Sequence, residues 1–270
     1  MIESRSPDRF NRAAYSSPVA IKRYERQSGL TEVERTILQS VRPEIRDKRL
    51  LDVGVGGGRT TASLLEISRD YTAIDYSPGM AATVKRRYGL DSVYCCDVRK
   101  MGRFAANTFD FVLFSFNGLD YIGHEDRLIA LSEIYRVLRP GAIFVFSSHN
   151  RSGDAAKLPW QQRDRRLSKV FIKRCIKILL AMPRHWRMRR FELRQAEYAI
   201  LNDTAFGFAI LTYYIDVDSQ KRQLEALGFE GIVAYSTSGV MVNEDSSSPW
   251  VHYLARKPDL RGDRGKEKGE

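Results

Sequence analysis

The residues with the clearest capacity for chemistry form a glycine-rich turn after an apolar run. The stretch 50–61 reads Leu-Leu-Asp-Val-Gly-Val-Gly-Gly-Gly-Arg-Thr-Thr, which predicts a buried strand, a tight turn and the start of a helix. The next apolar strand, 71–75, ends in Asp75. Glycine lets a backbone approach a ligand closely, and an acid at the end of a second strand can accept hydrogen bonds from a ribose diol. The pattern therefore predicts a nucleoside site.

The glycine spacing separates the classes of nucleotide site. A dinucleotide-binding turn, G-x-G-x-x-G, would place its third glycine at position 59, where this chain has Arg59. The phosphate-binding pattern G-x-x-x-x-G-K-[ST] does not occur in the sequence. The pattern present is Asp52 followed by Gly54, Gly56 and Gly58. At these residues the chain resembles the class I S-adenosylmethionine-dependent methyltransferases, whose first motif is this acid with G-x-G-x-G.

The resemblance implies how the first two strand ends would hold the cofactor, S-adenosyl-L-methionine. The three glycines of the turn would form the floor under its methionine part. Asp52 would fix that turn or reach the methionine ammonium group through water. Asp75 would hold the ribose hydroxyls, and Tyr76 would lie beside the adenine.

The resemblance continues at the third and fourth strand ends, and it covers roughly 48–256. Asp97 and Val98 match the acid-plus-apolar pair that receives the adenine amino group and packs on its ring. Ser115 begins a segment, ending at Asn117, that matches the one beneath the reacting methyl group. The hexapeptide Arg-Val-Leu-Arg-Pro-Gly resembles the signature before the fifth strand, although alanine follows it in place of a second glycine.

Two residues are candidates for the chemical step. In-line methyl transfer depends mainly on alignment, which can supply about 7–11 kcal/mol. A general base is needed for a hydroxyl acceptor and less so for an amine that arrives neutral. His149, two residues past the predicted strand 142–147, is the candidate base, with a solvated loop histidine as the alternative. Asn117 is the second candidate, because it belongs to the segment implied to lie beneath the methyl group.

Several tyrosines are candidates for the acceptor pocket, with ordinary packing as the alternative. They are Tyr15, Tyr121, Tyr213 and Tyr214.

These residues need an α/β scaffold to position them. From Leu50 onward apolar strands alternate with helices, which predicts a doubly wound, mostly parallel, seven-stranded sheet, the Rossmann-like fold of the family, with a helical-plus-hairpin insertion. The expected later strands are 92–96, 110–114, 142–147, 231–235 and 250–255, and the expected helices include 31–41, 78–88, 125–138 and 219–227. Five regions follow: a helical lid (1–48), the cofactor-binding core (49–150), a basic insertion interpreted as an acceptor lid (151–215), the end of the core sheet (216–256) and a disordered tail (257–270).

Composition sets further expectations. The chain has 270 residues, 43% of them hydrophobic, which is enough for one sizeable core. Its three cysteines form no C-x-x-C pair, and its four histidines are not spaced as metal ligands, so neither a disulfide framework nor a metal site is predicted. The sequence shows no signal-peptide core and no apolar run of the length that spans a bilayer. We expect a cytoplasmic, reduced protein, with peripheral attachment to a membrane left open.

The positive charge is confined to one segment. The net charge is +11, and the stretch 151–194 alone holds 14 Lys or Arg against three acids. Residues 167–182 fit a helix with a stripe of cations at Arg166, Lys169, Lys173 and Lys177. Four roles remain open: a lid packed on the core, contact of Leu167 to Arg190 with an anionic membrane surface or a lipid-linked acceptor, an acidic soluble acceptor, and, least favoured, nucleic acid.

The leading functional hypothesis is a methyltransferase that acts on a small molecule or glycan, anionic or lipid-linked. An RNA methyltransferase that uses the basic insertion is one alternative, although no Asn/Asp-Pro-Pro-Tyr run follows strand four. The other is a non-catalytic protein of the same fold that binds the cofactor or a membrane surface. A hairpin predicted at 197–214 would also suit pairing in a homodimer.

Overall fold

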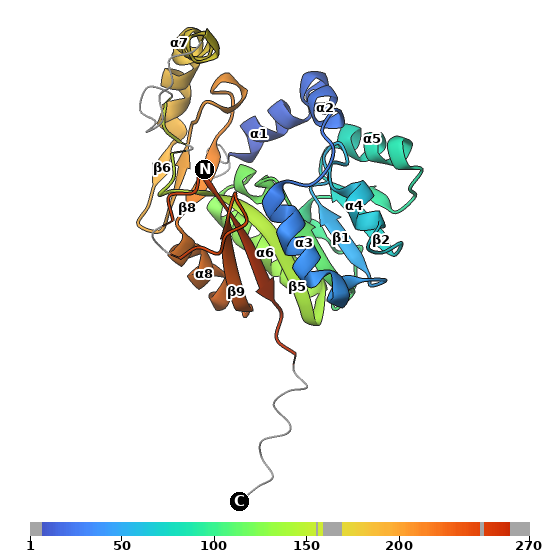
Figure 1. Ribbon diagram of the computed structural model, residues 1–270. Coiled ribbons are helices and arrows are strands. Elements are labelled where there is room, and N and C mark those ends of the chain that lie inside the picture. The colour runs from blue at the N-terminus through green and yellow to red at the C-terminus, as the bar shows by residue number, and fades with distance from the viewer. Residues whose placement is uncertain (1–6, 155, 159–168, 244–245, 260–270) are drawn as a thin grey trace, which may run out of the picture.

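The computed structural model describes residues 7–154, 156–158, 169–243 and 246–259 (Figure 1). The strands are β1 (Leu50–Val53), β2 (Tyr71–Asp75), β3 (Val93–Cys95), β4 (Phe109–Phe114), β5 (Leu138–Asn150), β6 (Leu193–Arg194), β7 (Tyr198–Leu201), β8 (Thr212–Ile215), β9 (Glu230–Ser236) and β10 (Trp250–Arg256). The α-helices are α1 (Asp8–Tyr15), α2 (Pro18–Glu25), α3 (Glu32–Ile45), α4 (Thr61–Leu65), α5 (Pro78–Tyr88), α6 (His124–Val137), α7 (Lys169–Met188) and α8 (Val217–Ala226). Of the predicted disordered tail (257–270), residues 257–259 are described, and the Lys257 N–H donates to the Ala142 carbonyl, so the prediction is wrong at its first residue. Residues 260–270 lie outside the described residues.

The sheet confirms the predicted doubly wound class but not the predicted strand number. It has ten strands rather than seven. Seven follow the order β3-β2-β1-β4-β5-β10-β9, with parallel pairing from β3 to β5 and antiparallel pairing of β10 on both its sides. The other three, β6, β7 and β8, come from the insertion, whose predicted hairpin is formed by β7 and β8.

The three extra strands join the sheet because β5 is longer than predicted. β5 runs to Asn150, whereas its pairing with β4 ends at Phe146. β8 pairs in parallel with His149 and Asn150, so the hairpin forms hydrogen bonds with the backbone of β5 beyond the end of β4. His149 consequently lies within the fifth strand and is buried, which corrects its predicted place in a loop two residues beyond that strand.

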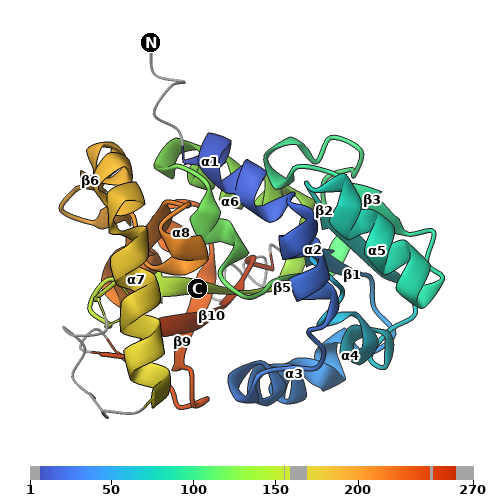
Figure 2. The same cartoon turned by 90° about the horizontal axis from the view of Figure 1, so that it is seen from above.

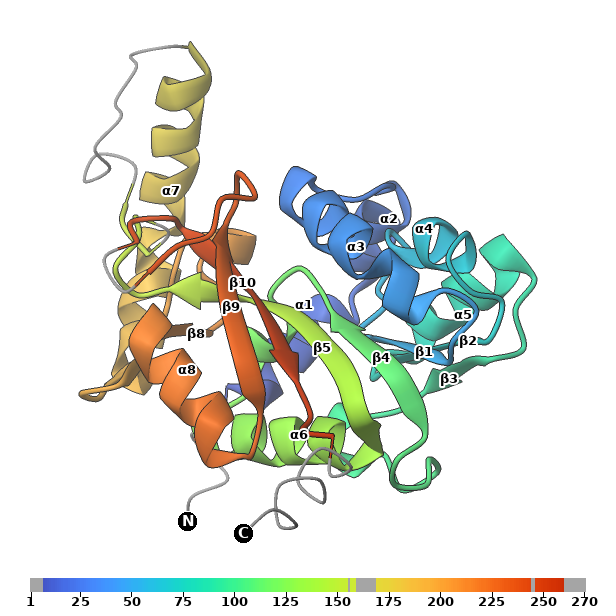
Figure 3. The same cartoon turned by 60° about the horizontal axis from the view of Figure 1, so that its bottom comes forward.

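Helices cover both faces of the sheet (Figure 3). On one face, α6 and α8 contribute Leu131, Ile134 and Leu224 to a core formed with β4 and β5. On the other, α3, α4 and α5 supply a second core that includes Ile37 and Leu64. β-strands buried on both faces have continuous apolar runs, which is why the sequence pattern was readable here.

The N-terminal region forms α1, α2 and α3, with α1 and α2 lying across the carboxyl edge of the sheet (Figure 2). Ser17 is the N-cap of α2 and accepts a hydrogen bond from the Ala20 N–H, which stabilises the start of the helix. Thr31 and Glu34 form a capping box that starts α3. In the described part of the chain, no helix is both long and apolar enough to cross a membrane.

A buried ion pair connects α6 to the segment that follows β4. Arg127 and Asp120 are fully buried, with Nη1 2.6 Å from Oδ1. Arg127 also donates to Gln220 of α8 and to Ser148 of β5. The guanidinium therefore links α6, α8, β5 and the 3-10 helix η3 (Gly118–Tyr121).

We expect Arg127→Ala to lower the free energy of unfolding by about 3–5 kcal/mol, because it leaves the Asp120 carboxylate buried without its cation. Urea unfolding of the purified chain measures the change. Arg222→Ala is the matched control, since Arg222 pairs with Asp218 on the surface, and we expect a change of at most about 1 kcal/mol there. Equal effects of the two substitutions would contradict this account.

Candidate functional site

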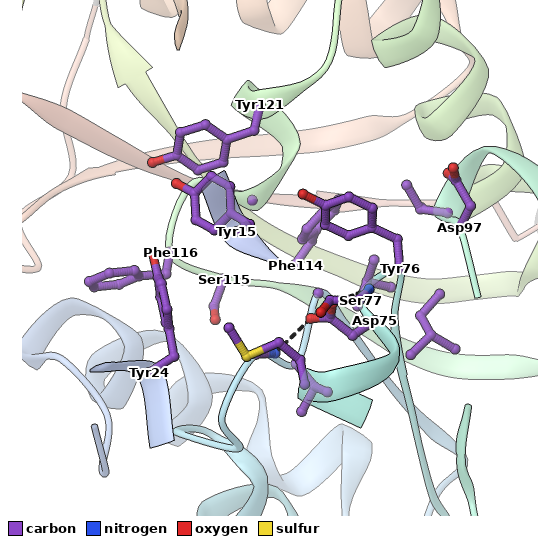
Figure 4. A pocket seen from close by; sticks show the side chains of 18 of the residues that line it. Tyr15, Tyr24, Asp75, Tyr76, Ser77, Asp97, Phe114, Ser115, Phe116 and Tyr121 are labelled. Carbon is purple, nitrogen blue, oxygen red and sulfur yellow. Dashed lines mark hydrogen bonds between the residues drawn. The ribbon is translucent and has the colours of Figure 1, made fainter. Parts of the chain in front are cut away.

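A cavity lies at the carboxyl edge of the sheet, where β1, β2, β3 and β4 end (Figure 4). Its empty space is about 1030 Å³, counting the open mouth. Seven of the predicted cofactor residues line it: Gly54, Gly56, Asp75, Tyr76, Asp97, Val98 and Ser115. Asp52, Gly58, Asn117 and His149, which were also predicted, are not part of the wall.

The glycine-rich turn forms one side of the cavity. Gly54, Gly56 and Gly58 have φ values of +62°, +55° and +82°, in the left-handed region that favours glycine. A Cβ on Gly54 would lie 2.7 Å from the ring of Phe114, and one on Gly58 would lie 2.8 Å from the ring of Tyr88. Gly58 therefore serves the packing of the turn against α5, while Gly54 and Gly56 face the cavity.

Asp75 lies at the end of β2 and is held by backbone donors. Its Oδ2 accepts from the Gly56 N–H at 2.9 Å, and its Oδ1 accepts from the Ser77 N–H at 2.8 Å. Burial raises the pKa of Asp75 to about 6, although these two N–H groups lower it. The carboxylate thus joins the first turn to the second strand end and keeps acceptor capacity for a ligand.

Asp52 is buried beneath the turn rather than exposed to the cavity. Its Oδ2 accepts from Thr60 Oγ1 at 2.6 Å and from the Tyr71 hydroxyl at 3.0 Å. Burial raises the pKa of Asp52 to about 6 despite these two donors. Asp52 is placed to fix the turn, which is one of its two predicted roles.

Asp97 is engaged by an arginine from its own loop. Arg99 binds both oxygens of the Asp97 carboxylate and also contacts Asp8 of α1 and Asp126 of α6. Burial alone would raise the pKa of Asp97, but the hydrogen bonds from Arg99 hold it below its ordinary value. The third strand end is therefore clamped to α1 by Arg99, a residue that the sequence motif did not point to.

The opposite end of the cavity is aromatic. Tyr15 and Tyr24 come from α1 and α2, and Tyr121 comes from η3 (Figure 4). The Tyr15 ring centroid lies 4.7 Å from that of Tyr121 and 5.9 Å from that of Tyr24. Burial raises the pKa of Tyr15 and of Tyr121 well above the ordinary value, so both phenols stay neutral at physiological pH.

A second buried ion pair connects the turn to α3 and to the loop after β4. Both terminal nitrogens of Arg59 bind the Glu34 carboxylate, at 2.6 and 2.7 Å. One of them also donates to Ser115 Oγ at 3.2 Å, and the guanidinium lies over the ring of Phe116. Arg59 stands at the sequence position where a dinucleotide-binding turn has its third glycine. Its charge is paired with Glu34 within the protein.

The two predicted catalytic residues lie behind the wall. The Asp120 carboxylate accepts from the backbone N–H of His149 at 2.6 Å and lies 2.7 Å from its Nδ1. His149 Nε2 is 3.4 Å from Asn117 Nδ2, and the Asn117 backbone N–H donates to Ser147 Oγ at 2.8 Å. The network holds the loop in which Phe116 and Asn117 have positive φ.

The cavity is covered by the N-terminal helices and not by the insertion. Asp8, Tyr15, Tyr24 and Gln27 line it, whereas no described residue of the insertion does. The insertion pairs with the last two residues of β5 and touches the wall from outside, where the Phe206 ring centroid lies 5.1 Å from that of Tyr15. The interpretation of the insertion as the acceptor lid therefore stays a prediction, since its described residues flank the wall without lining it.

Sequence reasoning found the strand-end residues and missed those that arrive from elsewhere. Tyr15 and Tyr121 were candidates, and both line the cavity, whereas Tyr213 and Tyr214 are buried outside it. Tyr24 had no signal in the sequence, because its approach to the turn depends on how α2 packs. A Cβ on Gly57 would lie 2.4 Å from the Tyr24 backbone, so Gly57, the one glycine outside the G-x-G-x-G pattern, permits that contact.

Comparison with known proteins agrees with the geometry. Residues 51–146 match a family model described as a methyltransferase domain. The demethylmenaquinone methyltransferase of Beutenbergia cavernae is 36% identical over 98 residues, which cover 36% of this chain and 39% of that protein. The malonyl-[acyl-carrier protein] O-methyltransferase of Serratia marcescens is 32% identical over 122 residues, 43% of this chain and 45% of that one. The chain thus spans less than half the length of these two relatives.

A solved structure shares the whole fold. The S-adenosylmethionine dependent methyltransferase from Mesorhizobium loti superposes with a TM-score of 0.57 at 17% identity, over 83% of this chain and 97% of that one. The fold is thus of the Rossmann-like class, with a cavity at the sheet edge where this class binds ligands. Residues 51–146 match the methyltransferase family, and the chain as a whole shares the fold of an S-adenosylmethionine-dependent methyltransferase.

We expect Gly57→Ala to loosen α2, because the new methyl group would overlap the Tyr24 backbone. Overpacking of this kind costs about 1–3 kcal/mol. Hydrogen exchange of the α2 amides should accelerate at least about fivefold. Gly102→Ala is the control, since a Cβ there meets nothing within 4 Å. Unchanged exchange in α2 would show that Gly57 does not set this contact.

Proposed function

We propose that the chain binds S-adenosylmethionine in this cavity and transfers its methyl group to a small, planar, uncharged acceptor. The observation that carries the proposal is one continuous cavity with a carboxylate end at Asp75 and Asp97 and an aromatic end at Tyr15, Tyr24 and Tyr121. The first end suits a nucleoside, and the second suits a flat ring.

The residues present fit the cofactor. The Asp75 carboxylate is buried and accepts hydrogen bonds from two backbone N–H groups, so ribose hydroxyls would add the donors that a buried carboxylate favours. Gln27 Oε1 and Ser77 Oγ, from two residues of the wall, are buried without a hydrogen-bond partner in the described chain. Such oxygens in a native site usually mark a missing ligand or water.

The chain's contribution to methyl transfer would be binding and alignment. S-adenosylmethionine, when bound, supplies a methyl group that is already activated on a sulfonium. Gly54 and Gly56 would support the methionine part, with Tyr76 and Val98 beside the adenine. The helices α1 and α2 would exclude water, and the neutral hydroxyls of Tyr15 and Tyr121 would orient the acceptor by hydrogen bonds.

His149 and Asn117 would act as positioning residues. Neither of them lines the cavity. Both would hold the strained loop after β4, and Ser115 and Phe116 of that loop line the cavity. The described wall contains no histidine. That composition favours an acceptor which needs little help in losing a proton, such as a neutral amine or an acidic phenol or enol.

The charge of the wall argues against an anionic glycan or RNA acceptor. Its two cations, Arg59 and Arg99, are paired with Glu34 and with Asp97. The remaining excess charge lies in the insertion, which does not reach the wall in the described residues.

Cofactor binding should weaken below pH 6. Because burial raises the pKa of Asp75 to about 6, the ionised form that accepts from ribose hydroxyls is lost as the pH falls from 7 to 5. We expect calorimetric affinity for S-adenosylmethionine to fall about tenfold over this range, since each unit below the pKa removes about tenfold of the ionised form.

Two variants separate this effect from other titrations. Asp75→Asn should bind weakly at both pH values. Asp52→Asn should keep the pH dependence, although the pKa of Asp52 is also raised to about 6 by burial. Wild-type affinity for Asp75→Asn, or pH-independent binding by the unmodified chain, would contradict the assigned role.

Labelled S-adenosylmethionine and a panel of acceptors test the reaction. We expect methyl label on planar amines, phenols or enols. We also expect Tyr24→Ala to lower turnover at least tenfold while its cofactor affinity stays within about threefold of that of the unmodified chain. Label on anionic oligosaccharides or RNA would overturn the acceptor class. Binding without transfer to any class would favour the non-catalytic alternative.

A further inference from the structure

Helix α7 presents a row of large apolar side chains to water. It stands out from the body of the molecule, as two views agree (Figures 1 and 3). Its less exposed residues are 171, 175, 178, 181, 182, 185 and 188. Their helical spacing places them on one face, so this face of the helix packs on the chain. The exposed apolar residues, each between 50% and 78% accessible, are Val170, Ile172, Ile176, Leu179, Leu180 and Trp186. Burial of α7 on the core, one of the four roles left open for this segment, therefore accounts for only one face of the helix.

Most of the exposed side chains of α7 form two adjoining arcs, while Leu180 and Val170 lie among the cations. With 3.6 residues per turn, Ile172, Ile176 and Leu179 line up in one arc beside the packed face. The second arc is cationic and comprises Lys169, Lys173, Lys177, Arg184 and Arg187. The helix contains no Asp or Glu to neutralise it.

We propose that α7 docks on the surface of an anionic lipid bilayer. The apolar arc would enter the boundary between headgroups and acyl chains, and the cationic arc would lie on the anionic headgroups. A helix with a wide apolar arc, a Lys/Arg arc and an exposed Trp186 has the chemistry of an interfacial helix. This docking does not depend on the proposed methyl transfer.

Charge complementarity selects the bilayer among the possible occupants. A second copy of the chain would bring two cationic arcs together in a symmetric contact, which like-charge repulsion disfavours. Nucleic acid would engage the cations and leave Ile176 and Leu179 in water. An anionic bilayer satisfies both arcs at once.

The docked helix would also lie close to the rim of the cavity. Arg184 Nη1 donates to the carbonyl of Gly207 at 3.3 Å, in the 3-10 helix η6 (Ala205–Gly207). Phe206 of η6 packs on Tyr15 of the cavity wall, with ring centroids 5.1 Å apart. If the proposed function holds, the acceptor would be a ring compound that partitions into membranes.

Flotation of the full chain with vesicles tests the docking. Binding to vesicles of phosphatidylcholine alone is compared with binding to vesicles prepared with 30% phosphatidylglycerol. We expect binding to the anionic vesicles only, with a blue shift of tryptophan emission that Trp186→Phe removes. Lys173→Gln with Lys177→Gln should weaken binding about 25-fold, at about fivefold for each lysine. Ile176→Ser with Leu179→Ser should weaken it at least tenfold.

Matched surface variants control for charge and hydrophobicity. Lys48→Gln with Arg69→Gln removes two exposed cations elsewhere, and Val240→Ser with Met241→Ser removes two exposed apolar side chains elsewhere. Both should bind as the unmodified chain does. The proposal would be overturned if the chain did not bind anionic vesicles, or if the α7 variants bound them as well as the unmodified chain does. It would also be overturned if the α7 variants abolished self-association or RNA binding and left vesicle binding unchanged. Calorimetry with S-adenosylmethionine on the same samples reports the proposed function separately.

Discussion

The site depends on buried carboxylates that must find donors within the chain. Asp52, Asp75 and Asp120 are each buried at the sheet edge, where an unsatisfied acceptor would be costly. Their donors come from neighbouring loops, strands and helix α6: Thr60 and Tyr71 for Asp52, the Gly56 and Ser77 backbone for Asp75, and Arg127, Ser148 and His149 for Asp120. Satisfying these acids therefore fixes the same loops that line the cavity.

The arginines of the site also hold neighbouring elements in place. Arg59 joins the turn to Glu34 of α3, and Arg99 joins the third strand end to Asp8 of α1. Because each guanidinium is used to hold a helix of the N-terminal region, the cavity wall has little positive charge to offer a ligand. The segment with the largest excess of cations lies elsewhere, on α7, where the adjoining side chains are apolar. The structure thus separates a near-neutral aromatic cavity from a cationic outer surface.

Much of the fold and part of the site were predictable from local pattern. Apolar runs placed the core strands to within a few residues, and parallel strands bring their carboxyl ends to one edge, so Asp75, Asp97 and Ser115 were expected together. The start of α3 and the hairpin of the insertion were also predicted, because caps and turns are determined by neighbouring residues. His149 was misplaced because the length of β5 depends on its partners β8 and β10, which lie far along the chain.

The sequence by itself determined the order of elements, the acid-and-glycine turn and the position of the excess charge, since these depend on periodicity and spacing over a few residues. Only the tertiary structure decided that α1 and α2 cover the cavity, that Asp120 holds His149 behind it and that α7 stands apart with its apolar arc in water. These arrangements join segments separated by long stretches of chain. Their geometry follows from how the helices and the extra strands pack on the whole sheet, which no local pattern encodes.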